Sequence, residues 1–215
     1  IFSDCRKITG SKQSLTDDDF FLKELHSSEK WPAFLQTAVE KKRTIVICGE
    51  TGSGKTVLTR ALLKSLHKDE RVIILEDVHE VTVDHVVEAV YMMYGDAGKI
   101  GRVSATDALR ACMRLTPGRI IMTELRDDAA WDYLKALNTG HPGGVMSTHA
   151  NSARDAFNRI GLLIKATPIG RMLDMSDIMR MLYSTIDVVV HMEKRKIKEI
   201  YFDPEYKMQC VNGSL

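Results

Sequence analysis

The sequence has few cysteines, and none of them are arranged to bind a metal. Its four cysteines, Cys5, Cys48, Cys112 and Cys210, lie far apart, and no two form a CxxC motif. The histidines show no zinc-ligand spacing around them, so nothing in the pattern indicates a structural zinc site. Sparse cysteine of this kind fits a reducing cytoplasm. Cys48 lies within an apolar run, and we expect it to be a small core residue.

Long hydrophobic runs and an excess of one sign of charge are also absent. No apolar run approaches the roughly 18 residues of a membrane-spanning helix, and no signal peptide is visible. The formal net charge is +1, which gives no indication of binding to nucleic acid or to an anionic membrane. Hydrophobic residues make up 44% of the 215 residues, enough for one sizeable core. Because the sequence begins at Ile1 rather than at Met, we expect it to be part of a longer chain.

Short apolar runs alternate with helical patterns along most of the chain. Four strand-length runs have an apolar centre, as in parallel strands with both faces covered: residues 44–48, 72–75, 119–123 and 144–148. Helical spacing or capping signals mark other segments: residues 16–26, 32–42, 58–66, 105–114, a stretch capped by Asp127 or Asp128 that ends before Gly140, and one that starts at Ser152.

Two further runs, residues 186–192 and 197–202, flank a basic turn and predict a closing hairpin. The whole alternation predicts an α/β fold: a mostly parallel sheet with helices on both faces and a C-terminal β-hairpin.

The most specific motif lies between the first predicted strand and the next helix. Residues 49–56 read GETGSGKT, which matches the pattern GxxxxGK[ST] of phosphate-binding loops. Gly52 and Gly54 let the backbone turn its N–H groups toward phosphate oxygens, and the following helix adds its positive N-terminal end. We expect Lys55 to reach the β- and γ-phosphates and the Thr56 hydroxyl to ligate Mg²⁺. A chance glycine turn is the alternative, but the flanking strand and helix are the context that the motif requires.

The loop is therefore predicted to bind ATP together with Mg²⁺. The expected nucleotide contacts are Thr51, Gly52, Ser53, Gly54, Lys55, Thr56, Val57 and Arg126. Arg110 and Arg114 are further candidates for a phosphate or a subunit contact, although most arginines on such helices only solvate a face.

Acidic residues follow two of the predicted strands. Glu76 comes after residues 72–75, and Glu124 comes after residues 119–123. Ligands of parallel sheets bind at the carboxyl ends of strands, so either glutamate is a candidate to hold Mg²⁺ or to orient water toward the γ-phosphate. A solvated acid at the start of a loop is the alternative for each. Considered with the glycine loop, Glu124 is the candidate for polarising the attacking water, and Glu76 is its weaker companion.

Histidines, methionines and a basic run complete the candidates. His141 and His149 flank a glycine-rich strand, where a histidine is placed to donate to a phosphate, but a locally bonded loop histidine explains each equally well. Residues 194–198 are basic and are most simply a solvated hairpin tip. Methionines between Met172 and Met181 predict an adaptable packing surface, in the core or at a subunit interface.

The ordered set of motifs resembles the secretion, or traffic, ATPases of bacterial type II and type IV secretion and of type IV pili. The resemblance spans roughly residues 30–205 and is closest to the ATPase subunit of type IV secretion systems. Four segments carry it: residues 49–56, 74–80, 109–126 and 137–152. The first occurs in many hydrolases, whereas the last, which contains a histidine box, is highly specific to this family.

This resemblance implies roles for particular residues. Glu76 and Glu80 match the acidic box of the family, Glu124 its Walker B glutamate and His149 its histidine box, where it couples the γ-phosphate to motion. Arg114 and Arg126 match arginines that border the Walker B strand.

Two short departures accompany the match. Pro117-Gly118 stands where the family usually has Pro-Asp, and Thr123-Glu124 where it has Gly-Glu. The threonine adds bulk beside the glutamate and affects the expected water geometry.

The resemblance also implies an assembly and a place of action. It predicts a RecA-like ATPase domain in a homo-oligomeric, hexameric ring at the cytoplasmic face of the inner membrane, together with other secretion subunits. ATP hydrolysis would power substrate translocation or pilus assembly, and nucleic acid enters only as a transported substrate. Residues 1–30 are expected to be a linker or tail of a separate N-terminal domain, and residues 31–215 the C-terminal ATPase domain. The alternatives are a pilus assembly or retraction ATPase, a nucleic-acid motor, and a nucleotide-gated docking platform with marginal hydrolysis.

Overall fold

The structure is a computed structural model that describes residues 12–95, 103–126 and 129–213. The strands are β1 (Ile45–Gly49), β2 (Arg71–Glu76), β3 (Glu88–Met93), β4 (Arg119–Met122), β5 (Val145–Thr148), β6 (Val188–Glu193) and β7 (Lys196–Phe202). The helices are α1 (Asp17–Ser27), α2 (Trp31–Glu40), α3 (Lys55–Leu63), α4 (Ala105–Met113), α5 (Ala130–Asn138), α6 (Ala153–Ala166), α7 (Met175–Thr185) and α8 (Pro204–Asn212), with a 3-10 turn η1 (Gly170–Met172).

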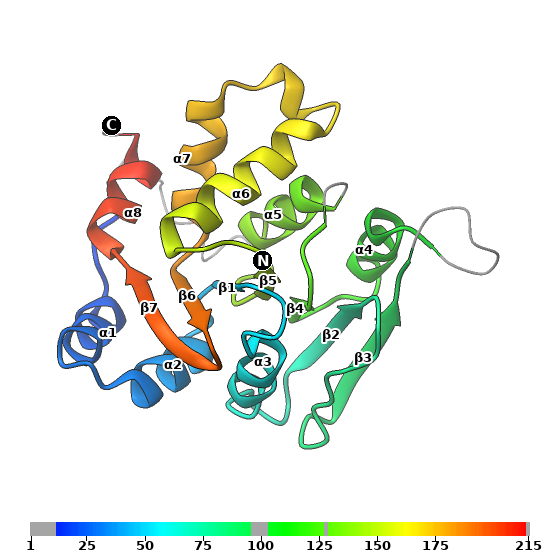
Figure 1. Ribbon diagram of the computed structural model, residues 1–215, viewed down its shortest axis with the longest axis horizontal. Helices are drawn as coiled ribbons and strands as arrows, with labels where there is room; N and C mark the ends of the chain where they lie inside the picture. Colours follow the sequence, from blue (N-terminus) through cyan, green and yellow to red (C-terminus); the bar gives the residue numbers. More distant parts are fainter. Residues whose placement is uncertain (1–11, 96–102, 127–128, 214–215) are drawn as a thin grey trace, which may run out of the picture.

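The strands form one sheet in the order β3-β2-β4-β5-β1-β6-β7 (Figure 1). Strands β1 to β6 pair in parallel, and β7 joins β6 in antiparallel register. This is the α/β, RecA-like P-loop fold with a C-terminal hairpin that the sequence predicts. Among the described residues, no helix has the length and apolar character needed to cross a membrane.

The central strands are apolar because helices cover both of their faces. Every residue of β1, β4 and β5 is buried. Side chains of β1 alternate between two cores: Val46 and Cys48 pack with α4, α5, α6 and α7, while Ile45 and Ile47 pack with α1, α2 and α3 (Figure 1). The prediction that Cys48 is a core residue is confirmed. Burial also raises the pKa of its thiol, to about 12.

Four elements were not predicted from the sequence: strand β3, the 3-10 turn η1, and helices α7 and α8. Strand β3 lies at the edge of the sheet, where its residues are exposed or only partly buried, so it lacks the continuous apolar run of its neighbour β2. Helix α8 begins at Pro204, after Asp203, whose side chain accepts a hydrogen bond from Tyr206 N. The pair Asp203-Pro204 is a capping signal visible in the sequence.

Helix starts agree with the predicted caps where the structure describes them. The side chains of Thr16 and Ser152 accept hydrogen bonds from the backbone N–H groups of Asp19 and Asp155. Helix α5 begins after Ala129, and no side chain of the described residues caps it. The predicted caps Asp127 and Asp128 lie outside the described residues.

Helix α1 packs against the sheet rather than standing apart from it. Its Leu22 is fully buried, and its Asp19 forms an ion pair with Arg43 at 2.8 Å. The division predicted at residue 30 stays a prediction, but residues 17–27 already belong to the packed unit described here. The methionines behave as the packing surface that the sequence predicts: Met179 and Met181 pack against the core, while Met172 is 87% exposed.

Replacing Thr16 with alanine is expected to lower the free energy of unfolding by about 1 kcal/mol. Thr16 and Asp19 form a capping box, in which Thr16 N donates to the Asp19 carboxylate at 2.8 Å and the Thr16 hydroxyl accepts from Asp19 N at 3.3 Å. Urea unfolding measures the effect. Ser14→Ala, an exposed substitution just before the helix, is the control. Equal stability of the two variants would contradict a contribution of this cap.

Candidate nucleotide-binding site

The glycine loop connects β1 to α3 and has the backbone that its sequence requires. Gly52 and Gly54 adopt φ values of +75° and +98°, in the region that side-chain-bearing residues rarely occupy. Gly54 directly precedes α3, so the N–H groups of the first turn of the helix face the loop. Together with the helix dipole, this arrangement favours an anion at the loop.

Lys55 lies over its own loop. Its ammonium donates to the carbonyl oxygens of Gly49 at 2.8 Å and Glu50 at 2.9 Å. Burial lowers the pKa of Lys55, and the negative charge of Glu124 partly opposes this. The charge of Glu124 therefore acts on the same amino group that is expected to meet a phosphate.

The tip of the β6–β7 hairpin closes one side of the loop. Arg195 N donates to the carbonyl oxygen of Ser53 at 3.0 Å. A cavity of about 410 Å³ lies between the loop and β6, and its lining includes Thr51, Asn151 and His191. The Ser53 hydroxyl is buried and has no protein partner within the described part of the chain. These features fit a phosphate group, because a polar loop with unused hydrogen-bonding capacity lines a cavity of suitable size.

The acidic segment after β2 brings Glu80, rather than Glu76, to the loop. The Thr56 hydroxyl donates to the Glu80 carboxylate at 3.0 Å. Glu76 is fully buried, and its carboxylate accepts hydrogen bonds from the backbone N–H groups of Glu80 at 3.2 Å and Val81 at 3.0 Å. It also lies 3.0 Å from His79 Nδ1. Glu76 therefore holds the turn that presents Glu80, and its predicted role as a metal ligand stays a prediction.

Glu124, Arg126 and His149 meet at the carboxyl ends of β4 and β5. The Glu124 carboxylate lies 3.7 Å from His149 Nε2 and 3.5 Å from Arg126 Nη2. Arg126 also forms an ion pair with Asp77, which follows β2. Burial alone would lower the pKa of Arg126, but the charges of Asp77 and Glu124 outweigh it and raise this pKa.

The backbone around Glu124 continues the sheet contacts beyond β4. Thr123 N donates to the Leu75 carbonyl at 3.1 Å, and Leu125 N donates to the Ser147 carbonyl at 2.8 Å. The Ser147 hydroxyl donates to the Thr123 carbonyl at 2.5 Å. The threonine that replaces the usual glycine of the family thus has its main chain bonded to both neighbouring strands.

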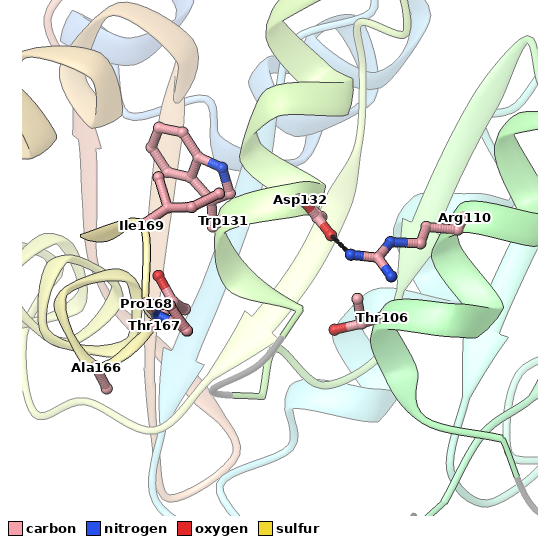
Figure 2. A pocket seen from close by; sticks show the side chains of 8 residues that line it. All are labelled: Thr106, Arg110, Trp131, Asp132, Ala166, Thr167, Pro168 and Ile169. Carbon is pink, nitrogen blue, oxygen red and sulfur yellow. Dashed lines mark ion pairs between the residues drawn. The ribbon is translucent and has the colours of Figure 1, made fainter. Parts of the chain in front are cut away.

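Other candidates lie outside this cluster. Arg110 pairs with Asp132 at 3.6 Å beside a second cavity of about 440 Å³, which Trp131 and Ile169 also line (Figure 2). No residue of the glycine loop lines this second cavity. His141 Nδ1 lies 2.9 Å from the Pro117 carbonyl, a local contact of the kind that the alternative interpretation describes. Arg114 is exposed at the end of α4.

Sequence reasoning missed two residues of the cluster. The sequence pattern assigns no role to Asp77, yet Asp77 pairs with Arg126. Tyr94 follows β3, the strand that was not predicted, and its hydroxyl donates to the Glu124 carbonyl at 2.8 Å. An aromatic residue just before Gly95, at the end of a weak apolar run, was the available signal.

The parallel sheet, the glycine loop between β1 and α3 and the acidic residues at neighbouring strand ends define a P-loop nucleotide-binding protein. Residues 12–199 match the family described as type II/IV secretion system protein, and the chain belongs to this family.

Characterised relatives come from type IV secretion systems. The chain is 37% identical over 205 residues to the type IV secretion system protein VirB11 of Brucella suis, a match that covers 91% of this chain and 57% of the relative. It is 40% identical over 167 residues to PtlH of Bordetella pertussis, covering 77% of this chain and 49% of the relative. The chain thus spans about half the length of these relatives.

Two solved structures share the fold of this chain. The chain is similar to the crystal structure of the VirB11 ATPase from the Brucella suis type IV secretion system in complex with sulphate. The TM-score is 0.86 at 34% identity, covering 96% of this chain and 62% of that one. A second match, the pilus retraction motor PilT with bound ADP, has a TM-score of 0.60 at 23% identity, covers 81% of this chain and 51% of that one, and shows the fold alone.

Proposed function

We propose that this chain is the ATPase domain of a type IV secretion ATPase and that it hydrolyses ATP to power substrate translocation. The observation that carries the proposal is the convergence of the glycine loop with Glu124 and His149 at the carboxyl ends of the central strands β1, β4 and β5. The likeness to VirB11 and PtlH supports the choice of type IV secretion. The likeness to PilT concerns the fold alone, so it gives no independent support to a pilus motor.

The glycine loop supplies the binding part of the proposed site. Its backbone N–H groups and Lys55 contact the phosphates, with Thr51, Ser53 and Val57 completing the loop. Thr56 and Glu80 are the proposed oxygen ligands of Mg²⁺. Glu76 is the alternative ligand, which the sequence favours. The ion, when bound, neutralises charge on the β- and γ-phosphates.

Glu124 supplies the chemical part. Its carboxylate accepts a proton from the attacking water, whose oxygen forms a bond to the γ-phosphorus. The bond from this phosphorus to the β–γ bridging oxygen breaks, which leaves ADP and inorganic phosphate. Arg126 and His149 flank the Glu124 carboxylate, where both are placed to respond when the γ-phosphate leaves. His149 is the proposed link between phosphate release and movement of the domain.

A wider assembly completes the proposal. We propose that the protein works as a homo-oligomeric ring, with six subunits, at the cytoplasmic face of the inner membrane, together with other secretion subunits. Family membership supports this proposal. Phosphate release from ATP and Mg²⁺ tests the enzymatic part, and light scattering with a non-hydrolysable ATP analogue tests the ring. If the wild type releases no more phosphate than Glu124→Gln does, the proposed hydrolysis is wrong. If the protein is a monomer under all nucleotide conditions, the proposed ring is wrong.

The structure also separates the two glutamates of the acidic segment. Glu80→Gln is expected to raise the Mg²⁺ concentration for half-maximal turnover by about tenfold, because an amide oxygen is a weaker ligand than a carboxylate beside Thr56. Glu76→Gln is expected to leave this concentration unchanged and to lower thermal stability, because Glu76 is buried within its own turn. Magnesium titrations of turnover, with melting curves, compare the two variants. If Glu76→Gln raises this Mg²⁺ concentration and Glu80→Gln does not, then Glu76 is the better candidate for the metal ligand.

A further inference from the structure

Tyr94 connects the two acidic segments of the site through main-chain atoms. Its backbone N–H donates to the Glu76 carbonyl at 2.8 Å, and its hydroxyl donates to the Glu124 carbonyl at 2.8 Å. Its side chain is buried among residues of β2, β4 and α4, with 2% of the residue exposed. Strand β2 lies between β3 and β4 in the sheet (Figure 1). The Tyr94 side chain, which follows edge strand β3, thus reaches across β2 to the segment after β4.

The Glu124 carbonyl lies where regular sheet pairing stops. The paired register between β4 and β5 covers Ile121 and Met122 only. Beyond it, the neighbouring backbone groups of Thr123 and Leu125 bond to adjacent strands. The Tyr94 hydroxyl supplies the hydrogen bond at Glu124 itself. Because this bond fixes the main chain that carries the carboxylate, it restricts where the carboxylate lies.

The same side chain also contacts the cation of the cluster. The Arg126 guanidinium carbon lies 6.0 Å from the centre of the Tyr94 ring, at the outer limit of a cation–π contact. Burial, followed by the charge of Asp77, raises the pKa of the Tyr94 phenol, so the hydroxyl stays a protonated donor at neutral pH. Tyr94 therefore contacts both Glu124, through its main-chain carbonyl, and the Arg126 guanidinium, without being a proton acceptor itself.

We propose that Tyr94 is a positioning residue, which holds the main chain at Glu124 so that its carboxylate is aligned for the chemical step. This inference rests on the proposed hydrolysis. Tyr94 acts through Glu124, so its loss should affect kcat rather than the binding of ATP. A misplaced reacting group commonly slows a reaction by an order of magnitude or more.

Tyr94→Phe tests the proposal because it removes only the hydroxyl. We expect kcat to fall about tenfold while the Kd for ATP changes by less than about twofold. Tyr133→Phe is a matched control. Tyr133 is fully buried, and its hydroxyl donates at 2.8 Å to the carbonyl of Ile120, on the same strand but before its carboxyl end. The control should lose similar stability and keep kcat.

A double-mutant cycle separates positioning from a general loss of structure. In the Glu124→Gln background, Tyr94→Phe should lower the residual rate by less than about twofold, because the group that it positions is already inactive. A tenfold fall in that background, or equal kcat values for Tyr94→Phe and Tyr133→Phe, would overturn the proposal.

Amide hydrogen exchange gives a readout that does not need turnover. The Leu125 amide should exchange faster in Tyr94→Phe than in Tyr133→Phe, because the hydroxyl holds the adjoining carbonyl. Equal exchange at Leu125 in the two variants would also overturn the proposal. A wild-type protein without turnover would contradict the proposed hydrolysis, and the exchange comparison would still decide the role of Tyr94 in holding this segment.

Discussion

Replacing Lys55 with alanine is expected to weaken ATP binding by about a hundredfold and to leave the fold intact. Lys55 is the one side-chain cation within residues 49–56. Its ammonium bonds to the carbonyls of Gly49 and Glu50 within the loop and contributes nothing to either hydrophobic core. The substitution therefore removes charge-assisted contacts to phosphate, while β1 and α3 keep their packing.

Calorimetric titration with ATP, beside a melting curve, measures this effect. Lys64→Ala is the matched control, because it removes the same charge from the exposed end of the same helix. A folded Lys55→Ala variant that binds ATP as the wild type does would remove the basis for the whole site. A low affinity shared by both variants would indicate a general charge effect instead of a contact to phosphate.

Glu124→Gln is expected to keep ATP binding and to lower turnover by about a hundredfold or more. The amide has nearly the shape of the carboxylate, so the segment between β4 and α5 keeps its packing. The glutamine amide cannot accept a proton from the attacking water. It also carries no negative charge to stabilise the positive charge that develops on this water. The loss of charge also weakens the contact that Arg126 makes with this side chain at 3.5 Å, although Asp77 continues to pair with this arginine.

Single-turnover phosphate release separates the chemical step from product release in this variant. Glu24→Gln, on the exposed face of α1, is the control for the loss of one carboxylate. If Glu124→Gln hydrolyses ATP within a few-fold of wild type, then Glu80 or Glu76 becomes the better candidate for activating water.

The buried strands could be predicted because burial on both faces leaves a continuous apolar run in the sequence. This is why β1, β2, β4 and β5 were found, each within two residues of its observed bounds. Strand β3 escaped the same reasoning because it lies at the edge of the sheet, where Glu88 and Met93 face solvent. Because a partly exposed strand has no continuous apolar run, its sequence is hard to distinguish from that of a loop.

The site divides in the same way between local and tertiary information. The glycine loop is local: its spacing implies its backbone, and the φ values of Gly52 and Gly54 agree with it. Which glutamate faces Thr56 is not local, because it depends on the turn in which the N–H groups of Glu80 and Val81 bond to the buried Glu76. The contact between Tyr94 and Glu124 could not be predicted, because it depends on how β3 and the end of β4 lie in the assembled sheet.

The order of strands has a consequence for how the protein is made. Strand β1, which carries the glycine loop, lies between β5 and β6, whose paired residues come about 100 and about 140 positions later in the chain. A ribosome therefore releases the phosphate-binding segment long before either neighbour exists, and its unpaired edges are exposed meanwhile. Contacts this distant in sequence also slow folding. The site is thus completed only after residues 188–202 have been made, when the β6–β7 hairpin reaches Ser53.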